Sequence, residues 1–155
     1  MSYMGIDIGT SACKAVVFDE RGQLLSSAYR EYPLSMPRPG YAELEPATVM
    51  EHCFAVIREA AAASPEAVRG IGISSQGEAF TPVDRQGRYL ANAMVSFDTR
   101  ATAVTGHWSE KIGRKKLYEI TGHTAHPMFT LFKLLWLREH ENAVFAAAEI
   151  GRAHV

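Results

Sequence analysis

The alternation of hydrophobic and polar positions in the first part of the chain predicts three β-strands. Short apolar runs occupy residues 3–8, 12–19 and 24–32, and the polar turn between the second and third runs is centred on Gly22. The links between the runs are too short to hold a helix. We therefore expect neighbouring strands to run antiparallel, as a three-stranded meander.

A longer amphipathic pattern predicts a helix over residues 46–63. Pro46 suits the first turn of a helix, and the apolar positions after it recur at helical spacing on one face. The proline-rich segment before this helix, residues 33–46, is expected to be an ordered loop without a regular element. After the helix, residues 68–74 predict a buried strand whose two glycines suggest close packing by a neighbouring backbone.

The second half of the chain is mainly helical in its pattern. Short strands are expected at residues 80–83 and 93–95, on either side of a polar turn. The helical spacing then predicts four helices, at residues 99–112, 114–120, 131–139 and 142–148. The predicted order is three strands, a helix, a further strand, short strands and then helices. This order is typical of a mixed α/β domain.

The composition and charge of the chain limit the classes of protein to which it can belong. The chain has 155 residues, of which 47% are hydrophobic and 21% charged, as in one soluble globular domain of ordinary size. A net charge of -1 gives no argument for a nucleic acid or a membrane surface, and no apolar run approaches the ~20 residues of a membrane span. Cys13 and Cys53 lack the spacing of a metal site, so we expect two reduced, buried thiols in a cytoplasmic protein.

Candidate chemistry gathers in the stretch GIDIGTSACK, between the first two predicted strands. Gly9 follows a strand end, and a turn without a Cβ lets backbone N–H groups approach a phosphate closely. Thr10 and Ser11 add hydroxyl donors, and Lys14 adds a cation. The stretch predicts a phosphate-binding hairpin made of two strands, with an ordinary polar turn as the alternative.

Asp7 lies in the same stretch, where a carboxylate by itself would repel a phosphate. Its presence indicates a Mg²⁺ ion between the carboxylate and the phosphate, with some of its water ligands retained. The chain has neither the Walker phosphate loop nor the glycine pattern of a dinucleotide-binding fold. The candidate site is therefore a phosphate and magnesium hairpin of a different kind.

Five segments, in order along the chain, resemble the FGGY carbohydrate kinases of the actin-like sugar-kinase superfamily. They are GIDIGTSACKAVVFDERGQLL, PGYAELEPATVM, GIGISSQGEAFTPVDRQG, VSFDTRA and TGHTAHPMFTLFKLLWLREHE. Each is a weak signal alone, but the resemblance covers residues 3–148. It implies an incomplete actin-like ATPase domain of ribonuclease H-like fold, with a mixed sheet that begins with the antiparallel meander and helices packed on it.

The resemblance also implies an activity and its cofactors. Members of the family use ATP and Mg²⁺ to phosphorylate a hydroxyl of a sugar or polyol, in a cleft between two actin-like domains. By motif, Asp7 would lie near Mg²⁺, through water, and Gly9, Thr10, Ser11 and Lys14 would approach the ATP phosphates. Such sites work by positioning and charge neutralisation, with little covalent chemistry for the protein to do.

The same resemblance places the substrate at Gln76, Gly77, Glu78, Asp98 and Arg100. Xylulokinases have Met-His after the glutamine and glycerol kinases have Arg-Glu, whereas this chain has Gly77-Glu78, so the identity of the sugar or polyol stays open. Glu78 would accept from substrate hydroxyls, Asp98 would be the other sugar-facing acid, and Arg100 would hold Asp98 or contact the sugar. The alternatives are a solvated loop acid for Glu78 and a helix N-cap for Asp98.

The family's general-base aspartate and its second domain are expected beyond the end of this chain. We therefore expect residues 1–149 to be part of an N-terminal kinase domain that is inactive alone and whose partner is the missing C-terminal domain. A homodimer of the full-length protein is left open. Residues 150–155 resemble a translated sequencing-adapter sequence and are expected to be non-native, with an ordinary frayed C-terminus as the alternative.

Two alternatives of other classes stay open from the sequence. One is a non-catalytic sugar-binding or regulatory module of the same ancestry. The other is an acetate-type or transcription-regulator-type relative, whose regulator version lacks support because no helix-turn-helix precedes Gly5.

Overall fold

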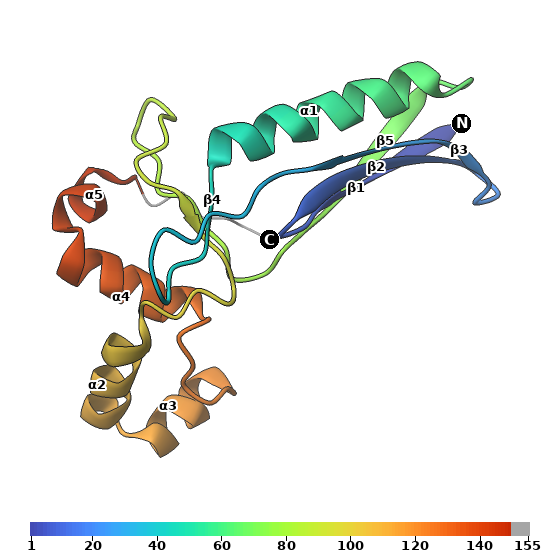
Figure 1. Ribbon diagram of the computed structural model, residues 1–155. Helices are drawn as coiled ribbons and strands as arrows, with labels where there is room; N and C mark the ends of the chain where they lie inside the picture. The colour runs from blue at the N-terminus through green and yellow to red at the C-terminus, as the bar shows by residue number, and fades with distance from the viewer. Residues whose placement is uncertain (150–155) are drawn as a thin grey trace. The chain divides into compact units, whose positions relative to one another are not determined.

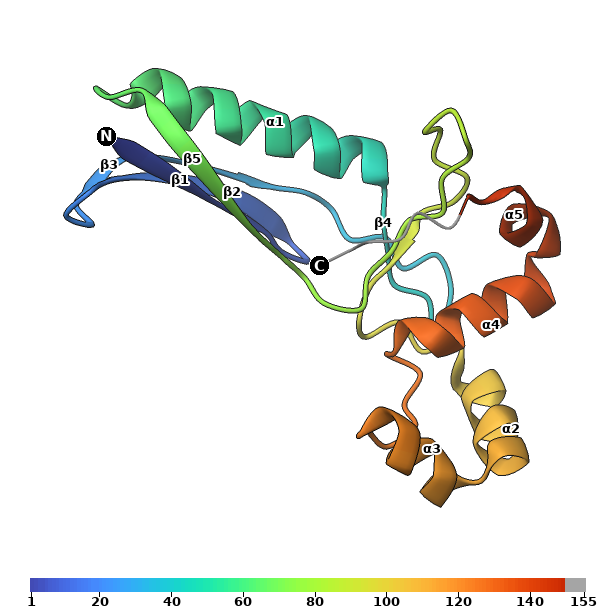
Figure 2. The same ribbon diagram turned by 180° about the vertical axis from the view of Figure 1, so that it is seen from behind.

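The computed structural model describes residues 1–149, and the chain forms two compact units (Figures 1 and 2). The sheet unit consists of Met1–Leu34 and Glu45–Gly77. The helical unit consists of Ser35–Leu44 and the chain from Glu78 onward. The segment 150–155, expected to be a non-native tail, lies outside the described residues.

The sheet unit is a four-stranded sheet with one helix. Its strand order is β3-β2-β1-β5, antiparallel except for the parallel pair of β1 and β5. The elements are β1 (Ser2–Ile8), β2 (Ala12–Asp19), β3 (Leu24–Glu31), α1 (Pro46–Ala63) and β5 (Val68–Ser75). The predicted antiparallel meander and the first predicted helix are therefore confirmed, the helix with both of its ends.

Helix α1 covers one face of the sheet, where it packs against β2 and β3 (Figures 1 and 2). Along β1 and β2 every second side chain is buried, as expected for strands with one covered face. The core between sheet and helix contains Met4, Ile6, Cys13, Ala15, Val17, Cys53, Val56 and Ala60. Cys13 and Cys53 are free thiols in this core, and burial raises the pKa of each.

The prediction that residues 68–74 form a buried strand is wrong about burial. Strand β5 is there, but Ile71 is 60% exposed and Ile73 68% exposed. The reason is that α1 covers β2 and β3, while β5 lies at the opposite edge of the sheet beside β1. The suggested close approach of a backbone is also wrong. A Cβ at Gly70 would meet the side chain of Tyr3 at 3.1 Å, and one at Gly72 would meet nothing within 4 Å.

The helical unit combines a small two-stranded sheet with helices. Its elements are β4 (Glu43–Leu44), β6 (Ala93–Met94), α2 (Thr102–Ile112), α3 (Arg114–Thr121), α4 (Thr130–His140) and α5 (Asn142–Ala147). All four predicted helices are present, the first of them beginning three residues later than the expected Thr99. Their common core contains Met94, Ala101, Val104, Leu117, Phe132, Trp136 and Leu137.

Two short elements differ from the predictions. The segment 33–46 was expected to hold no regular element, but β4 lies within it and pairs with β6. The strand expected at residues 80–83 is reduced to isolated bridges, Phe80 with Met94 and Val83 with Tyr89. A two-residue strand leaves no hydrophobic period in the sequence, because its pairing depends on a distant partner.

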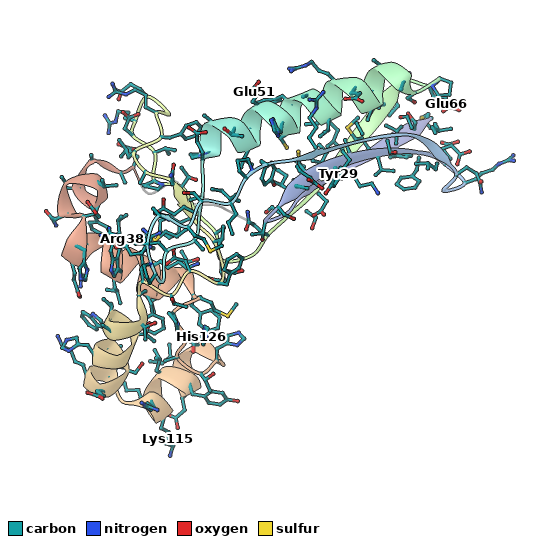
Figure 3. The ribbon with its side chains drawn as sticks, in the orientation of Figure 1. Tyr29, Arg38, Glu51, Glu66, Lys115 and His126 are labelled. Carbon is teal, nitrogen blue, oxygen red and sulfur yellow. The ribbon has the colours of Figure 1, made fainter. Side chains whose placement is uncertain are left out.

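The outer surface of the helical unit carries solvated charges. Lys115 on α3 is 91% exposed and points into solvent (Figure 3). Among residues 1–149, no helix combines the length and the apolar character needed to cross a membrane.

Candidate functional site

In the sheet unit, the turn between β1 and β2 is built at residues 9–11. The two strands pair up to Ile8 opposite Cys13, and Gly9 N then donates to Ala12 O at 2.9 Å to close the turn. A Cβ on Gly9 would lie 3.1 Å from that same carbonyl oxygen, so a larger residue would disturb the closure. We call this segment the 9–11 turn.

Asp7 and Lys14 are partners across the antiparallel pair, two residues before and three residues after the 9–11 turn. Both side chains are exposed, on the sheet face that α1 does not cover. They line an open depression of about 420 Å³ together with Gly5, Phe18 and Ser74. The structure therefore brings together an acid, a cation and a tight glycine turn, the three features that the sequence predicted for a phosphate hairpin.

Tyr32, the residue directly after β3, is hydrogen-bonded to the 9–11 turn and the residue after it. Its hydroxyl has a single proton, which it shares between Gly9 O at 2.5 Å and Ala12 O at 3.0 Å, and its backbone N donates to Ser11 O at 3.0 Å. The side chain is buried, and burial raises the pKa of Tyr32 to about 12. Tyr32 was not among the residues predicted from the sequence, although a buried tyrosine at the end of a predicted strand needs a partner for its hydroxyl.

Gln76 directs its side-chain amide at the same turn. Its Nε2 donates to Gly9 O at 3.3 Å, and its Oε1 accepts from the Thr10 hydroxyl at 3.0 Å. Its backbone N donates to Ile8 O at 2.9 Å and so prolongs the parallel pairing of β1 with β5. Gln76, one of the five residues predicted to bind the substrate, is thus hydrogen-bonded to Gly9 and Thr10, which were predicted to bind phosphate.

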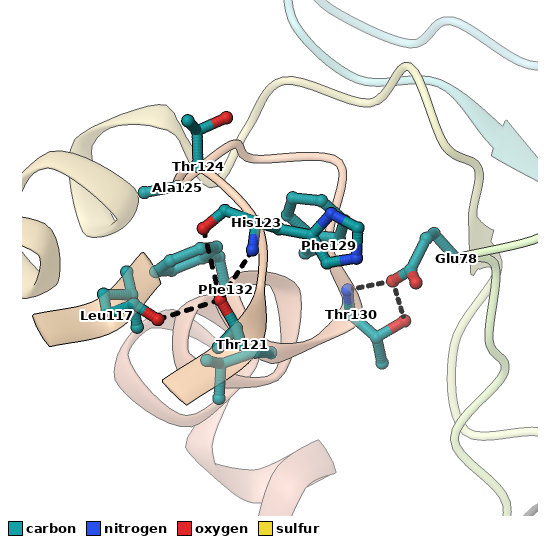
Figure 4. Close-up of a pocket in the computed structure, with 10 residues that line it drawn as sticks. Glu78, Leu117, Thr121, His123, Thr124, Ala125, Phe129, Thr130 and Phe132 are labelled. Carbon is teal, nitrogen blue, oxygen red and sulfur yellow. Dashed lines mark hydrogen bonds between the residues drawn. The ribbon is translucent and has the colours of Figure 1, made fainter. Parts of the chain in front are cut away.

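In the helical unit, Glu78 is held by α4. Its Oε2 accepts from the backbone N and the hydroxyl of Thr130 at 2.5 and 2.7 Å (Figure 4). A carboxylate at a helix N-terminus satisfies free N–H groups and interacts favourably with the helix dipole. Glu78 also has a φ of 60°, in the left-handed region that side chains other than glycine rarely adopt.

A cavity of about 290 Å³ lies beside this carboxylate. Figure 4 shows Glu78 and Phe129 at one end of it and Thr121 near Leu117 at the other. The Thr121 hydroxyl donates to Leu117 O at 2.9 Å and accepts from His123 N at 3.2 Å, which fixes the loop after α3. The cavity is mainly apolar with a carboxylate and hydroxyls at its margin, the lining that suits a small polar ligand with a carbon face.

Lys133 on α4 is a fully buried charge that the sequence analysis missed. Its Nζ donates to Glu78 O at 2.6 Å, Val95 O at 2.8 Å and Met94 O at 3.4 Å. Burial lowers the pKa of Lys133 to about 8, although the carboxylates of Asp98 and Glu78 act in the opposite direction. A lysine inside the apolar run LFKLLWL was the available signal, because such a position faces the core of a helix-packed unit.

Asp98 and Arg100 form a buried ion pair. Asp98 is 1% exposed, and its Oδ2 accepts from Arg100 Nη2 at 2.7 Å and from Ala42 N at 2.7 Å. Arg100 also reaches Glu43 Oε1 at 2.6 Å, and its guanidinium lies 3.8 Å from the centre of the Tyr41 ring. Of the two roles expected for Arg100, the structure shows the one in which it holds Asp98.

The alternative that Asp98 caps a helix is wrong. Helix α2 begins at Thr102 with Ala101 as its N-cap residue, and no side chain bonds that end. Both oxygens of Asp98 are already used by Arg100, by its backbone N as well as by its guanidinium. The Asp98 carboxylate therefore binds Arg100 instead of the N–H groups at the start of a helix.

Comparison with known proteins identifies the family. The model of the "FGGY family of carbohydrate kinases, N-terminal domain" matches residues 2–153. The chain belongs to this family. Its fold class is confirmed as well: the β3-β2-β1-β5 sheet with its helices is that of the actin-like N-terminal domains of FGGY kinases.

Individual FGGY relatives include kinases for several substrates. A glycerol kinase of Methylorubrum extorquens is 36% identical over 152 residues, which is 96% of this chain and 30% of that protein. An L-xylulose/3-keto-L-gulonate kinase of Escherichia coli is 35% identical over 149 residues, 93% of this chain and 30% of that protein. A ligand-bound xylulose kinase from Lactobacillus acidophilus superposes with a TM-score of 0.90 at 27% identity, covering 96% of this chain and 30% of its own. The chain spans about 30% of the length of the FGGY kinases it matches.

Proposed function

We propose that this chain supplies the N-terminal part of an ATP-dependent kinase that transfers the γ-phosphoryl group to a hydroxyl of a sugar or polyol. Membership of the FGGY family carries this proposal. The 9–11 turn supports it, because a glycine turn flanked by Asp7 and Lys14 offers backbone N–H groups and a cation to a phosphate. We place the general base and the second actin-like domain outside these residues.

The donor set at the 9–11 turn fits a magnesium nucleotide rather than a magnesium ion held by protein alone. Asp7 is exposed, and the described residues contain no group of three or more metal-binding side chains. Mg²⁺ is commonly bound through one or two carboxylates with several waters and the phosphates of a nucleotide. Mg²⁺ held there by Asp7 would neutralise phosphate charge. Gly9, Thr10, Ser11 and Lys14 would contact the ATP phosphates.

For the acceptor, we propose that Glu78 contacts the substrate hydroxyls and that Asp98 and Arg100 support the loops around it. Glu78 uses Oε2 for both of its contacts with Thr130 and borders the 290 Å³ cavity. The carboxylate of Asp98 is saturated by Arg100 and Ala42, which suits a supporting role. Gly77 adds no side chain, so it would leave room for the substrate.

Turnover by the full-length protein tests the proposed function. ADP release should be measured with a coupled assay against a panel of pentuloses, hexuloses and polyols. We expect at least one of them to stimulate ADP release by the full-length protein, and none to do so with the 155-residue chain alone. Absence of stimulation by every acceptor would overturn the proposed activity, and turnover by the isolated chain would overturn the placement of the general base outside it.

Removing the Glu78 carboxylate should damage use of the acceptor. In the full-length protein, Glu78→Ala is expected to lower kcat/KM for the sugar or polyol by about tenfold or more, because a charged hydrogen-bond acceptor is lost. The KM for MgATP should change less than twofold. Thr130→Val is the matched control, because it removes one contact to Glu78 and keeps the carboxylate. Equal acceptor kinetics in Glu78→Ala and wild type would contradict the assignment.

Removing the charge of Asp7 should instead damage use of the nucleotide. Asp7→Asn is expected to raise the KM for MgATP or lower kcat by about tenfold, because the carboxylate would no longer attract Mg²⁺. Glu51→Gln is the control, since Glu51 is an exposed acid on α1 (Figure 3). If Asp7→Asn and Glu51→Gln had the same steady-state constants over a range of Mg²⁺ concentrations, Asp7 would have no metal role.

A further inference from the structure

The carbonyl of Gly9 accepts hydrogen bonds from two side chains that belong to different parts of the sheet unit. Tyr32 Oη donates to it at 2.5 Å from the end of β3, and Gln76 Nε2 donates at 3.3 Å from beyond the end of β5. Because a trans peptide is planar, its C=O and the following N–H point in opposite directions. Holding the Gly9 carbonyl toward Tyr32 and Gln76 therefore turns the N–H of Thr10 away from them.

The amide of Gln76 is orientated by both of its ends. With Nε2 donating to Gly9 O, Oε1 is left to accept from the Thr10 hydroxyl at 3.0 Å. The reverse orientation would place two carbonyl oxygens against one another. Because the Thr10 hydroxyl gives its proton to Gln76, the group that Thr10 presents outward is its backbone N–H.

The position of Gln76 itself is fixed by the sheet. Its backbone N donates to Ile8 O at 2.9 Å, directly before the 9–11 turn. Tyr32 is fixed in the same way, because its backbone N donates to Ser11 O. Its hydroxyl keeps its proton at physiological pH, since burial raises the pKa of Tyr32 to about 12. Both side chains thus place a donor against the Gly9 carbonyl, and the Tyr32 hydroxyl also lies 3.0 Å from Ala12 O.

We propose that Gln76 and Tyr32 are positioning residues that orient the 9–11 turn for the nucleotide phosphates, and that Gln76 acts on the nucleotide rather than on the sugar. This inference rests on the proposed kinase function for its ligand. It moves Gln76 out of the substrate-binding set, in which the resemblance had placed it. On this proposal, the loop after β5 contributes the side chain of Gln76 to the phosphate site.

Binding of MgADP to the full-length protein tests the proposal without requiring turnover. We expect Gln76→Ala to weaken MgADP at least fivefold, and Tyr32→Phe, which removes only the hydroxyl, to weaken it in the same direction. Tyr29→Phe is the matched control: Tyr29 lies on β3, three residues before Tyr32, is 56% exposed (Figure 3), and donates to Glu31 instead of the turn. Wild-type affinity in both Gln76→Ala and Tyr32→Phe would overturn the proposal.

Steady-state kinetics separates a positioning role from a substrate contact. Gln76→Ala should raise the KM for MgATP or lower kcat, while the KM for the sugar or polyol stays within twofold of wild type. A raised acceptor KM with an unchanged MgATP KM would assign Gln76 to the substrate and overturn the inference. If the wild type binds MgADP but phosphorylates no acceptor, the proposed function fails while the binding comparison still decides the role of Gln76.

Gln76→Met distinguishes positioning from loss of packing, because it keeps the length of the side chain and adds no charge near the phosphates. The thioether cannot donate to Gly9 O. We expect MgADP binding to be weakened in Gln76→Met to about the same extent as in Gln76→Ala. Near-wild-type binding by Gln76→Met would show that the hydrogen bond to the Gly9 carbonyl does not orient the turn, and would also overturn the proposal.

Discussion

Replacing Arg100 with alanine is expected to lower the free energy of unfolding of the chain by about 3–5 kcal/mol, because it leaves a buried carboxylate without its partner. Asp98 is 1% exposed and receives four of its hydrogen bonds from the backbone and guanidinium of Arg100. Glu43, at 15% exposure, would lose its cationic partner and keep only its hydrogen bond from Asn92. The loss would also remove the guanidinium from the face of the Tyr41 ring.

Urea unfolding of the wild type and variant, followed by circular dichroism, measures this effect. Arg138→Ala is the control, because Arg138 is 43% exposed, its pair with Glu139 spans 3.9 Å, and such surface pairs contribute about 0–1 kcal/mol. A double variant, Arg100→Met with Asp98→Leu, should be less damaged than Arg100→Ala, since it removes both charges. Stability of Arg100→Ala within 1 kcal/mol of wild type would mean that Asp98 is not held mainly by this ion pair.

The sequence was most informative where structure depends on neighbours along the chain. Strand β2 and helix α1 have the predicted ends, because period-two and helical spacing are local and Pro46 marks the helix start. The exposure of β5 was not predictable in this way. It follows from where α1 lies across the sheet, and the apolar run of Ile71 and Ile73 reads alike for a buried strand and an uncovered one.

The same division holds for the candidate site. Asp7, Gly9 and Lys14 could be found because they lie within one hairpin. The side chains that orient this hairpin come from far along the chain, with Gln76 Nε2 reaching Gly9 across a separation of 67 residues. Glu78 is likewise held by Thr130, at a separation of 52 residues. A single sequence contains no direct signal for such pairings. It shows only that a polar residue at a position expected to be buried must find a hydrogen-bond partner.

Lys133 gives the second large expected effect. Lys133→Met keeps the length of the side chain but should lower the free energy of unfolding by roughly 2–4 kcal/mol at pH 7, because it removes the donor from three backbone carbonyls in the buried interior. The loss is smaller than the sum of three broken hydrogen bonds, since the buried ammonium also has a desolvation cost. Lys115→Met, at an exposed position on α3, should change stability by less than 0.5 kcal/mol.

The pH dependence of this difference identifies the buried ammonium as its cause. Burial lowers the pKa of Lys133 to about 8 in the folded chain, whereas the unfolded chain has the ordinary value near 10.5. Between these values the unfolded state binds more protons, so raising the pH stabilises the wild type through Lys133. Measured from pH 8 to 10.5, the advantage of wild type over Lys133→Met should therefore grow by up to roughly 3 kcal/mol. The cysteines and Tyr32 titrate equally in both proteins, so a difference that stayed constant or shrank across this range would show that Lys133 is not a desolvated cation.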